Sequence, residues 1–219
     1  MGFGLLQILR DDPLVFVMLA IALIEAIAMH EYAHALAADL QGDRMPRAFG
    51  RLTLNPAKHL DPLGTLMLLL VGFGWGKPVE FRPQALSSRR FGGAIVALAG
   101  PMMNLALALA AAVVARIMGL DFRFPLFAVG PDRDPFALFL LLFFSINVLL
   151  AVFNLIPLPP LDGSRLLTIF LPPDKQRIIY FLDQYGFLIL LALLFFSGFR
   201  FITPILEQVQ DVLLTVVGS

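Results

Sequence analysis

PLVFVMLAIALIEAIAMHEYAHALAADL, residues 13–40, is an apolar block with ionisable side chains gathered near its end. About 20 apolar residues suffice to cross a bilayer as a helix, and this block is longer. Pro13 is typical of a helix start, and Gly42 of a helix end. Two histidines, Glu31 and Asp39 occupy its last third, although each ionisable group in a membrane helix costs about 3 kcal/mol. We therefore expect a partner that offsets this cost.

The composition of the whole chain indicates a helical membrane protein. Of 219 residues, 59% are hydrophobic and 15% are charged, against about a quarter charged in a soluble domain. The mean hydropathy is +0.85, and the apolar residues come in long blocks. The formal net charge is zero, so no basic surface points to a nucleic-acid partner. The chain has no cysteine, which excludes thiolate chemistry.

Further apolar blocks predict an all-α polytopic membrane protein of one domain, residues 1–219, with a core at 13–170. Blocks at 93–118 and 135–156 are long enough to span, and 184–202 is predicted as an extra transmembrane helix. Segment 204–217 has helical spacing of apolar residues and is predicted as an amphipathic helix on the membrane surface. We thus expect about four transmembrane helices.

Two loops next to the membrane have an alternating pattern. The sequences RMPRAFGRLTLNPAKH (44–59) and GKPVEFRP (76–83) both contain proline and glycine. Such runs are compatible with short strands or a hairpin. We expect short membrane-associated strands in these loops.

The basic residues predict the topology of the block at 59–76. Eight lysines and arginines lie between residues 41 and 92, and a spanning block at 59–76 would divide them equally between the two sides. The positive-inside rule disfavours that division. We therefore expect 59–76 to be re-entrant or interfacial, with 41–92 and 161–183 in the cytoplasm; five crossings are the alternative. The predicted location is the cytoplasmic membrane of a prokaryote.

The pattern HEYAH (30–34) is typical of a metal site. His30 and His34 are four residues apart, so a helix places both imidazoles on one face, as two ligands of one tetrahedral zinc require. Glu31 lies about 100° around the helix and can act as general base on a water. Histidines that only bond within a helix bundle are the alternative, but a dication would also offset the cost of the buried ionisable groups.

A catalytic zinc commonly has a third protein ligand, for which the sequence offers two candidates. One is His59. The other is Asp162, which follows a proline-rich break at the end of the fourth block, where freed backbone must lie beside protein or water. In the predicted topology Asp162 lies on the same cytoplasmic side as the two histidines, which favours the aspartate.

Three elements together resemble the site-2 protease family of intramembrane zinc metalloproteases. They are HEYAH (30–34), AGPMMN (99–104) and NLIPLPPLDG (154–163), in the order of that family. NPAKHLDPLG (55–64) is also similar to its compact bacterial and archaeal members. The chain departs from larger relatives in lacking room for a PDZ or CBS domain.

The resemblance implies one zinc ion per chain, bound by His30, His34 and Asp162, with Glu31 as the base. It implies that Asn154 contacts the substrate backbone or assists the oxyanion. The implied partners are the lipid bilayer and transmembrane protein substrates, which are cleaved near the cytoplasmic face.

Two further polar residues have open roles at this stage. Asn104 either binds substrate or forms an interhelical hydrogen bond at a kink. His59, if not a ligand, is expected near the mouth of the site.

Two other functions are alternatives to proteolysis of membrane proteins. One is hydrolysis of a prenylated or lipid substrate, but no glutamate downstream of the motif fits as a third ligand, since Glu207 is the only one after Glu80. The other is non-enzymatic metal binding or transport, but the paired broken helices or inverted repeats of transporters are not visible.

Overall fold

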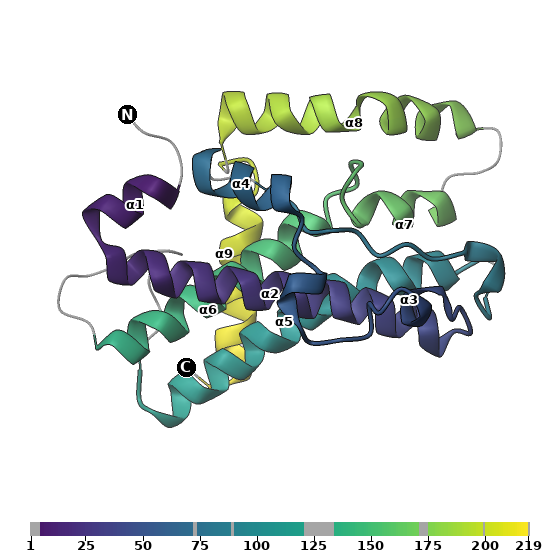
Figure 1. Cartoon of the computed structure of the whole chain (residues 1–219). Helices are drawn as coiled ribbons and strands as arrows, with labels where there is room; N and C mark the ends of the chain where they lie inside the picture. The colour runs from purple at the N-terminus through teal and green to yellow at the C-terminus, as the bar shows by residue number, and fades with distance from the viewer. Residues whose placement is uncertain are drawn as a thin grey trace.

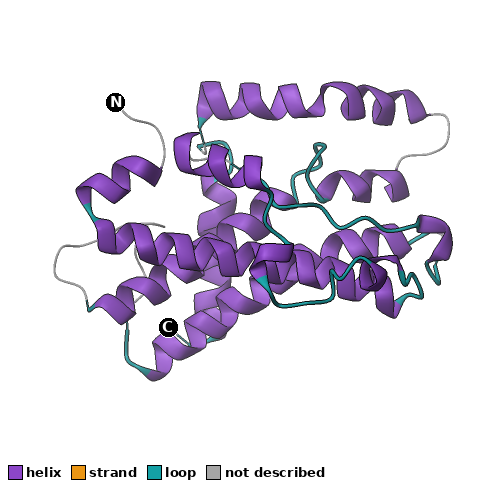
Figure 2. Cartoon of the chain, viewed as in Figure 1, coloured by secondary structure: helices purple, strands orange, loops and turns teal. Residues whose placement is uncertain are grey.

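The computed structural model describes residues 5–71, 74–88, 90–120, 134–170, 175–198 and 200–218 (Figure 1). Within these ranges the regular elements are helices, and Figure 2 shows no strand there. The all-α prediction is confirmed. The elements are α1 (Leu5–Asp11), α2 (Pro13–Leu40), α3 (Met45–Ala48), η1 (Pro56–Lys58), α4 (Pro62–Val71), η2 (Pro83–Ala85), α5 (Gly92–Ile117), α6 (Pro135–Asn154), α7 (Gly163–Phe170), α8 (Gln176–Ser197) and α9 (Thr203–Val216).

Four of the described helices are long and apolar enough to cross a membrane, as predicted. They are α2, α5, α6 and α8. The starts and ends of the first three agree with the sequence prediction to within two residues. The predicted bounds 184–202 for the last one are wrong, because α8 begins at Gln176 and ends at Ser197. The first turns of α8, from Gln176 to Asp183, are rich in polar residues and for that reason were predicted as a loop. The helix ends earlier than predicted because Gly198 has a positive φ of 58°.

Local sequence signals fix the starts of two spanning helices. Asp12 accepts hydrogen bonds from the first free N–H groups of α2, those of Leu14 and Val15, both at 3.1 Å. Asp134 caps α6 in the same way, through the N–H groups of the second and third residues of that helix. A proline follows each cap at the first helical position, where its missing N–H costs nothing.

The core of the protein is the packing of α2, α5 and α6, which lie side by side in Figure 1. Their contacting faces are rich in alanine, which lets helix backbones approach closely in a membrane. The buried alanines include Ala22, Ala26, Ala35, Ala108 and Ala112. By contrast, only 11% of the apolar window of α8 is buried, so most of that helix is left to face lipid.

The helix within residues 59–76 is short, and the two ends of this segment meet. The helix within them, α4, has ten residues and is about 15 Å long, half of the roughly 30 Å hydrocarbon core. An antiparallel bridge joins Leu60 to Gly76, so the segment leaves and returns at the same place. The position of this segment in the membrane stays a prediction, with five crossings as the alternative.

The predicted short strands are not found in the described residues of 44–59 and 76–83. The first segment contains α3 and η1. The second has no regular structure up to Arg82, where η2 follows, and its only bridge is that of Gly76 with Leu60. Proline is the physical reason. Pro46 and Pro56 begin helical turns, and Pro78 removes a donor that a ladder would need.

The C-terminal helix α9 is amphipathic, as predicted for 204–217. Leu206 and Leu214 are buried against α5 and α6, whereas Glu207 and Asp211 are exposed. In Figure 1, α9 crosses α5 and α6 at a steep angle. Its contacts show that part of its apolar face is used within the protein, so a position on the membrane surface stays a prediction.

Candidate metal centre

His30 and His34 lie one turn apart on α2 and point to one place. Their Nε2 atoms are 3.0 Å apart, and both side chains are buried. Asp162 approaches the same point, with its Oδ2 atom 3.0 Å from Nε2 of His30 and 3.2 Å from that of His34. Among the described residues, these three form the group of potential ligands that could hold a metal ion.

The hydrogen bonds on the far side of each imidazole show which nitrogen is free. Nδ1 of His30 lies 2.6 Å from Oδ1 of Asn104, and Nδ1 of His34 lies 2.7 Å from the carbonyl oxygen of Val96. Both oxygens can only accept, so Nδ1 carries the proton in each ring. Each Nε2 atom therefore presents a lone pair to the other and to the carboxylate.

Three lone pairs that face one another repel unless a cation lies between them. Tetrahedral zinc with bonds of about 2.0–2.1 Å would separate its ligand atoms by about 3.3 Å. The observed separations of 3.0–3.2 Å are close to this value. The donor set of two imidazoles and one carboxylate, with room for a fourth ligand, suits zinc.

A turn that folds back on the end of α6 positions Asp162. The helix ends at Asn154, and the proline-rich segment returns the chain so that Gly163 packs against the carbonyl groups of Leu155 and Ile156. A Cβ atom at Gly163 would lie less than 3.0 Å from these groups. The glycine after the aspartate is therefore required by the close return of the backbone.

Gly100 of α5 lies directly against the imidazole rings of His30 and His34. A Cβ atom at this position would lie less than 3.0 Å from ring atoms of both His30 and His34. Any side chain here would push the rings away from their shared point. The backbone of α5 thus forms the floor of the metal centre.

Asn104 lies one turn further along α5, is completely buried, and makes three hydrogen bonds. Its Oδ1 atom faces His30, and its Nδ2 atom donates to the carbonyl oxygen of Ala26 at 3.1 Å and to Oδ1 of Asn147 at 2.8 Å. The amide connects the three core helices. It contacts the back of a ligand and does not line the cavity described next.

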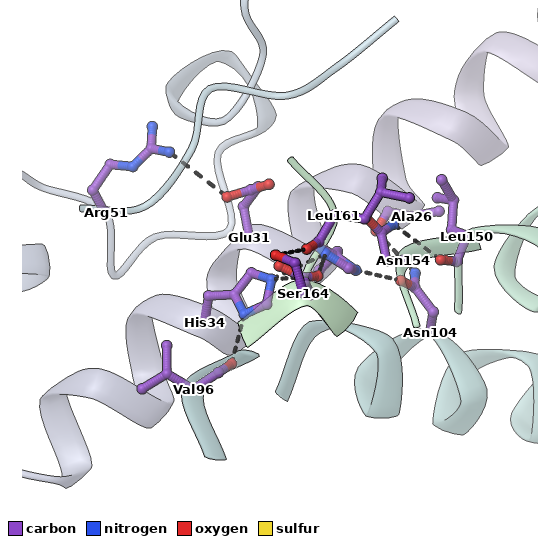
Figure 3. Close-up of polar contacts among 12 residues, drawn as sticks. Ala26, Glu31, His34, Arg51, Val96, Asn104, Leu150, Asn154, Leu161 and Ser164 are labelled. Carbon is purple, nitrogen blue, oxygen red and sulfur yellow. Dashed lines mark hydrogen bonds and ion pairs between the residues drawn. The ribbon is translucent and has the colours of Figure 1, made fainter. Parts of the chain in front are cut away.

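A cavity of about 580 Å³ opens beside the three potential ligands. Glu31 lines it, and its side chain is 13% exposed. Asn154, at the end of α6, also lines it and donates to the carbonyl oxygen of Leu150 at 2.9 Å. Figure 3 shows these side chains around the site. The cavity thus joins the metal centre, a carboxylate outside the ligand set and a polar amide.

His59 lies apart from the other ligand candidates. It is completely buried in the loop after α3, where Nε2 bonds the carbonyl oxygen of Thr53 at 2.7 Å. Burial lowers the pKa of His59 and the nearby Arg51 lowers it further, against the opposing effect of the hydrogen bond to Thr53. The structure does not bring this histidine into the group with His30, His34 and Asp162.

Sequence reasoning missed two residues around the site. Asn147 supports Asn104, and its place in the middle of the apolar helix α6 was a usable signal, since polar residues there commonly bond across helices. Arg51 lies 4.0 Å from the Glu31 carboxylate, as Figure 3 shows, yet in the sequence it is one of eight basic residues in a loop. Nothing in the sequence distinguishes it from its neighbours.

Comparisons with known proteins agree with this geometry. The model of Peptidase family M50 matches residues 18–126 and 132–193. Three similar relatives share the name "Putative zinc metalloprotease". YwhC of Bacillus subtilis is 38% identical over 190 residues, covering 85% of this chain and 81% of the relative.

The other two relatives are named Rip2. That of Mycolicibacterium smegmatis is 34% identical and covers 89% of this chain and 70% of the relative. The relative from Mycobacterium tuberculosis (strain H37Rv) is 33% identical, and the match covers 82% of this chain and 67% of the relative. No solved structure matches the chain significantly. The residues matched by the family model include all three potential ligands and Glu31. The chain belongs to peptidase family M50, as its resemblance to the site-2 proteases predicted.

Proposed function

We propose that this protein is a zinc-dependent endopeptidase that hydrolyses a peptide bond in transmembrane segments of other proteins. One observation carries the proposal: the three lone pairs of His30, His34 and Asp162 meet at one point, at the wall of a cavity that Glu31 also lines. The site lies between helices that are long and apolar enough to span a membrane. Membership of peptidase family M50 supports hydrolysis of a peptide bond.

The roles of the residues follow from their positions. Zinc bound by the two imidazoles and the carboxylate would acidify a water and polarise the scissile carbonyl group. Glu31, which is outside the ligand set, accepts the proton of the attacking water and returns it to the leaving nitrogen. Asn154 lines the cavity and offers its amide to the substrate backbone or the oxyanion.

The other two polar residues have supporting roles in this proposal. Asn104 fixes the tautomer and the ring orientation of His30, since its only acceptor atom faces Nδ1. His59 holds the loop after α3 in shape through Thr53. Direct contact with substrate is not needed from either.

The cavity fits an apolar substrate segment. Its walls include Leu23 and Ile27 of α2, Phe153 of α6, and Phe187 and Leu190 of α8. A helical substrate hides its scissile carbonyl in hydrogen bonds and has to extend locally. The extended backbone at 77–83 borders the cavity and could pair with such a segment by strand addition.

The membrane position follows from the charge pattern. We propose that 59–76 is re-entrant or interfacial from the cytoplasmic side, which its short helix and closed base support. The site then faces the cytoplasm, and the protein resides in the cytoplasmic membrane of a prokaryote.

Cleavage and bound zinc measured on the same samples test this function. Wild type, Glu31→Gln and Glu25→Gln would be incubated with single-span substrates in detergent and in liposomes. Glu25 is the matched control, because it is an exposed glutamate on α2 that does not line the cavity. We expect Glu31→Gln to keep zinc and to lose about 10²–10⁴-fold in rate, the usual contribution of a general base.

The Glu25→Gln control shows whether a loss of cleavage rate is specific to Glu31. Glu25→Gln should cleave within about twofold of wild type, since its side chain touches no reacting group. Equal cleavage by Glu31→Gln and wild type would remove the base from the mechanism. Zinc binding without cleavage of any peptide, but with hydrolysis of a lipid or prenylated substrate, would replace the proposed substrate class.

A further inference from the structure

Arg51 is a buried arginine whose side chain joins two distant loops. It is 6% exposed, and its two terminal nitrogens donate to the carbonyl oxygens of Lys58 and Lys77. These two residues flank the place where segment 60–76 leaves and returns. The N–H group of Lys77 also donates to the carbonyl oxygen of His59 at 2.7 Å. The base of the segment is thus held by backbone contacts and by one guanidinium group.

The base of this segment touches the proposed catalytic carboxylate. At Gly76 a Cβ atom would meet Oε1 of Glu31 at 3.3 Å and a methyl group of Ile27 at 3.0 Å. The backbone at Gly76 therefore lies directly against the Glu31 side chain. At the second oxygen of that carboxylate, Nη2 of Arg51 lies 4.0 Å from Oε2. The Glu31 carboxylate is confined between the closed base and the arginine.

We propose that Arg51 is a positioning residue that clamps the base of segment 60–76 against Glu31 and so holds this carboxylate in place for catalysis. The inference rests on the proposed protease function for its catalytic half only. The clamp itself is a property of the fold and can be measured in protein that cleaves nothing.

The clamp needs the geometry of an arginine. A guanidinium group is a rigid planar fork that donates to two acceptors at once and stays charged when buried. A lysine has one compact ammonium group on a flexible stem and could not hold the same fixed fork between both carbonyl groups. The ion pair with Glu31 is too long at 4.0 Å to act as the main attachment. The two carbonyl contacts therefore carry the clamp.

Trp75 gives a readout that is independent of activity. It is the only tryptophan in the chain, it precedes Gly76, and it lines the cavity. We would measure acrylamide quenching of its fluorescence in wild type, Arg51→Met, Arg51→Lys and Arg44→Met. The matched control is Arg44, which pairs with Asp39 and does not line the cavity.

We expect quenching to rise about twofold or more in both Arg51 variants and to stay unchanged in the control, because only Arg51 holds the base near Trp75. Arg51→Lys guards against a folding defect, since it keeps the charge and most of the volume. Unchanged quenching in Arg51→Met, or wild-type quenching in Arg51→Lys, would overturn the clamp.

The catalytic half is tested by steady-state kinetics and zinc content. In Arg51→Met, kcat should fall about tenfold to a hundredfold, which is the scale expected from misplacing a catalytic group by about 1 Å. KM should change less than about threefold, and zinc should stay bound, since neither substrate contacts nor ligands are altered. Arg44→Met should keep kcat within about twofold of wild type.

Three outcomes would overturn the catalytic half. They are an unchanged kcat, a change in KM alone, or a loss of zinc that parallels the loss of activity. The last result would mean that Arg51 positions the metal ligands and not the Glu31 carboxylate. If wild type itself cleaves no substrate, the proposed function fails, while the quenching experiment still decides whether the clamp exists.

Discussion

Carboxylates that are wholly or partly shielded from solvent occur in two regions of this protein, and their surroundings differ. The side chain of Asp162 is 24% exposed, whereas Asp39 and Asp43 are buried. Asp162 faces the imidazoles of His30 and His34, at 3.0 Å and 3.2 Å from their Nε2 atoms. Asp39 instead receives charged donors from Arg44 at 3.0 Å and Arg47 at 2.7 Å. The first carboxylate meets two imidazoles, with which we propose that it binds zinc, and the second is neutralised by two arginines of the chain itself.

Asp43 belongs to the second kind. It is completely buried, and it accepts from the guanidinium and the backbone N–H of Arg82 and from the backbone N–H of Met45. Burial by itself would raise the pKa of Asp43, but these donors outweigh it and hold the pKa below its usual value. The comparison teaches that burial of a carboxylate does not by itself mark function. Asp43 is buried against an arginine, whereas the carboxylate of Asp162 meets two imidazoles at one point beside a cavity.

The largest expected effect is the loss of zinc in Asp162→Ala, which distinguishes the region of Asp162 from that of the arginine-paired carboxylates. Asp162→Ala removes one of three ligands, so bound zinc and cleavage should both fall to background. The measurement is zinc per chain after gel filtration, with Asp43→Asn as the matched variant from the arginine-paired region. Zinc loss in Asp43→Asn as well would mean that the two regions do not differ in the way proposed.

Gly100→Ala tests whether the floor of the metal centre is as tight as the geometry indicates. The added methyl group would come within 3.0 Å of both imidazole rings, so one ring has to move. We expect zinc affinity to fall by about tenfold to a hundredfold, the scale seen when ligand orientation is lost. Gly93→Ala is the control, because a Cβ atom there meets nothing within 4 Å. Equal zinc affinity in both variants would contradict this prediction.

Asn104 variants test the orientation of His30. Asn104→Ala removes the acceptor for Nδ1 and should lower zinc affinity by about tenfold or more. Asn104→Asp keeps an acceptor facing the ring and should retain more affinity than the alanine variant, although it loses the donors to Ala26 and Asn147. If both variants bind zinc as wild type does but raise KM, the role of Asn104 lies with substrate instead.

The smallest expected effect on activity is in the arginine-paired region. Asp43→Asn should lower the free energy of unfolding by about 1–2 kcal/mol, because buried donors lose a charged acceptor, and should leave cleavage within about twofold. Since the pKa of Asp43 is lowered in the folded state, its contribution is present above the unfolded pKa of about 3.9 and is lost as pH falls through the folded value.

Thermal melts at pH 7 and near pH 3 check the sign of this contribution. The difference between wild type and Asp43→Asn should be larger at pH 7 and should shrink in acid. A difference that grows in acid would contradict the assignment of Asp43 as a stabilising carboxylate.

The sequence by itself determined the long helices and the pair of histidines. The bounds of α2 are those of the apolar block, because a proline, a capping aspartate and apolar length act locally. The spacing of His30 and His34 places both rings on one face through helix geometry alone. These features depend on neighbours within a few residues, which a sequence displays directly.

Tertiary structure alone decided the rest of the site. Asp162 reaches His30 across 132 residues only because the chain folds back at the end of α6, and the sequence left His59 as an alternative until then. Packing of three helices turned Asn104 toward the back of His30. The strands expected beside the membrane are not found, and the side chain of Arg51 instead contacts the carbonyl oxygens of Lys58 and Lys77. Such contacts depend on which faces meet in space, and no local periodicity encodes that choice.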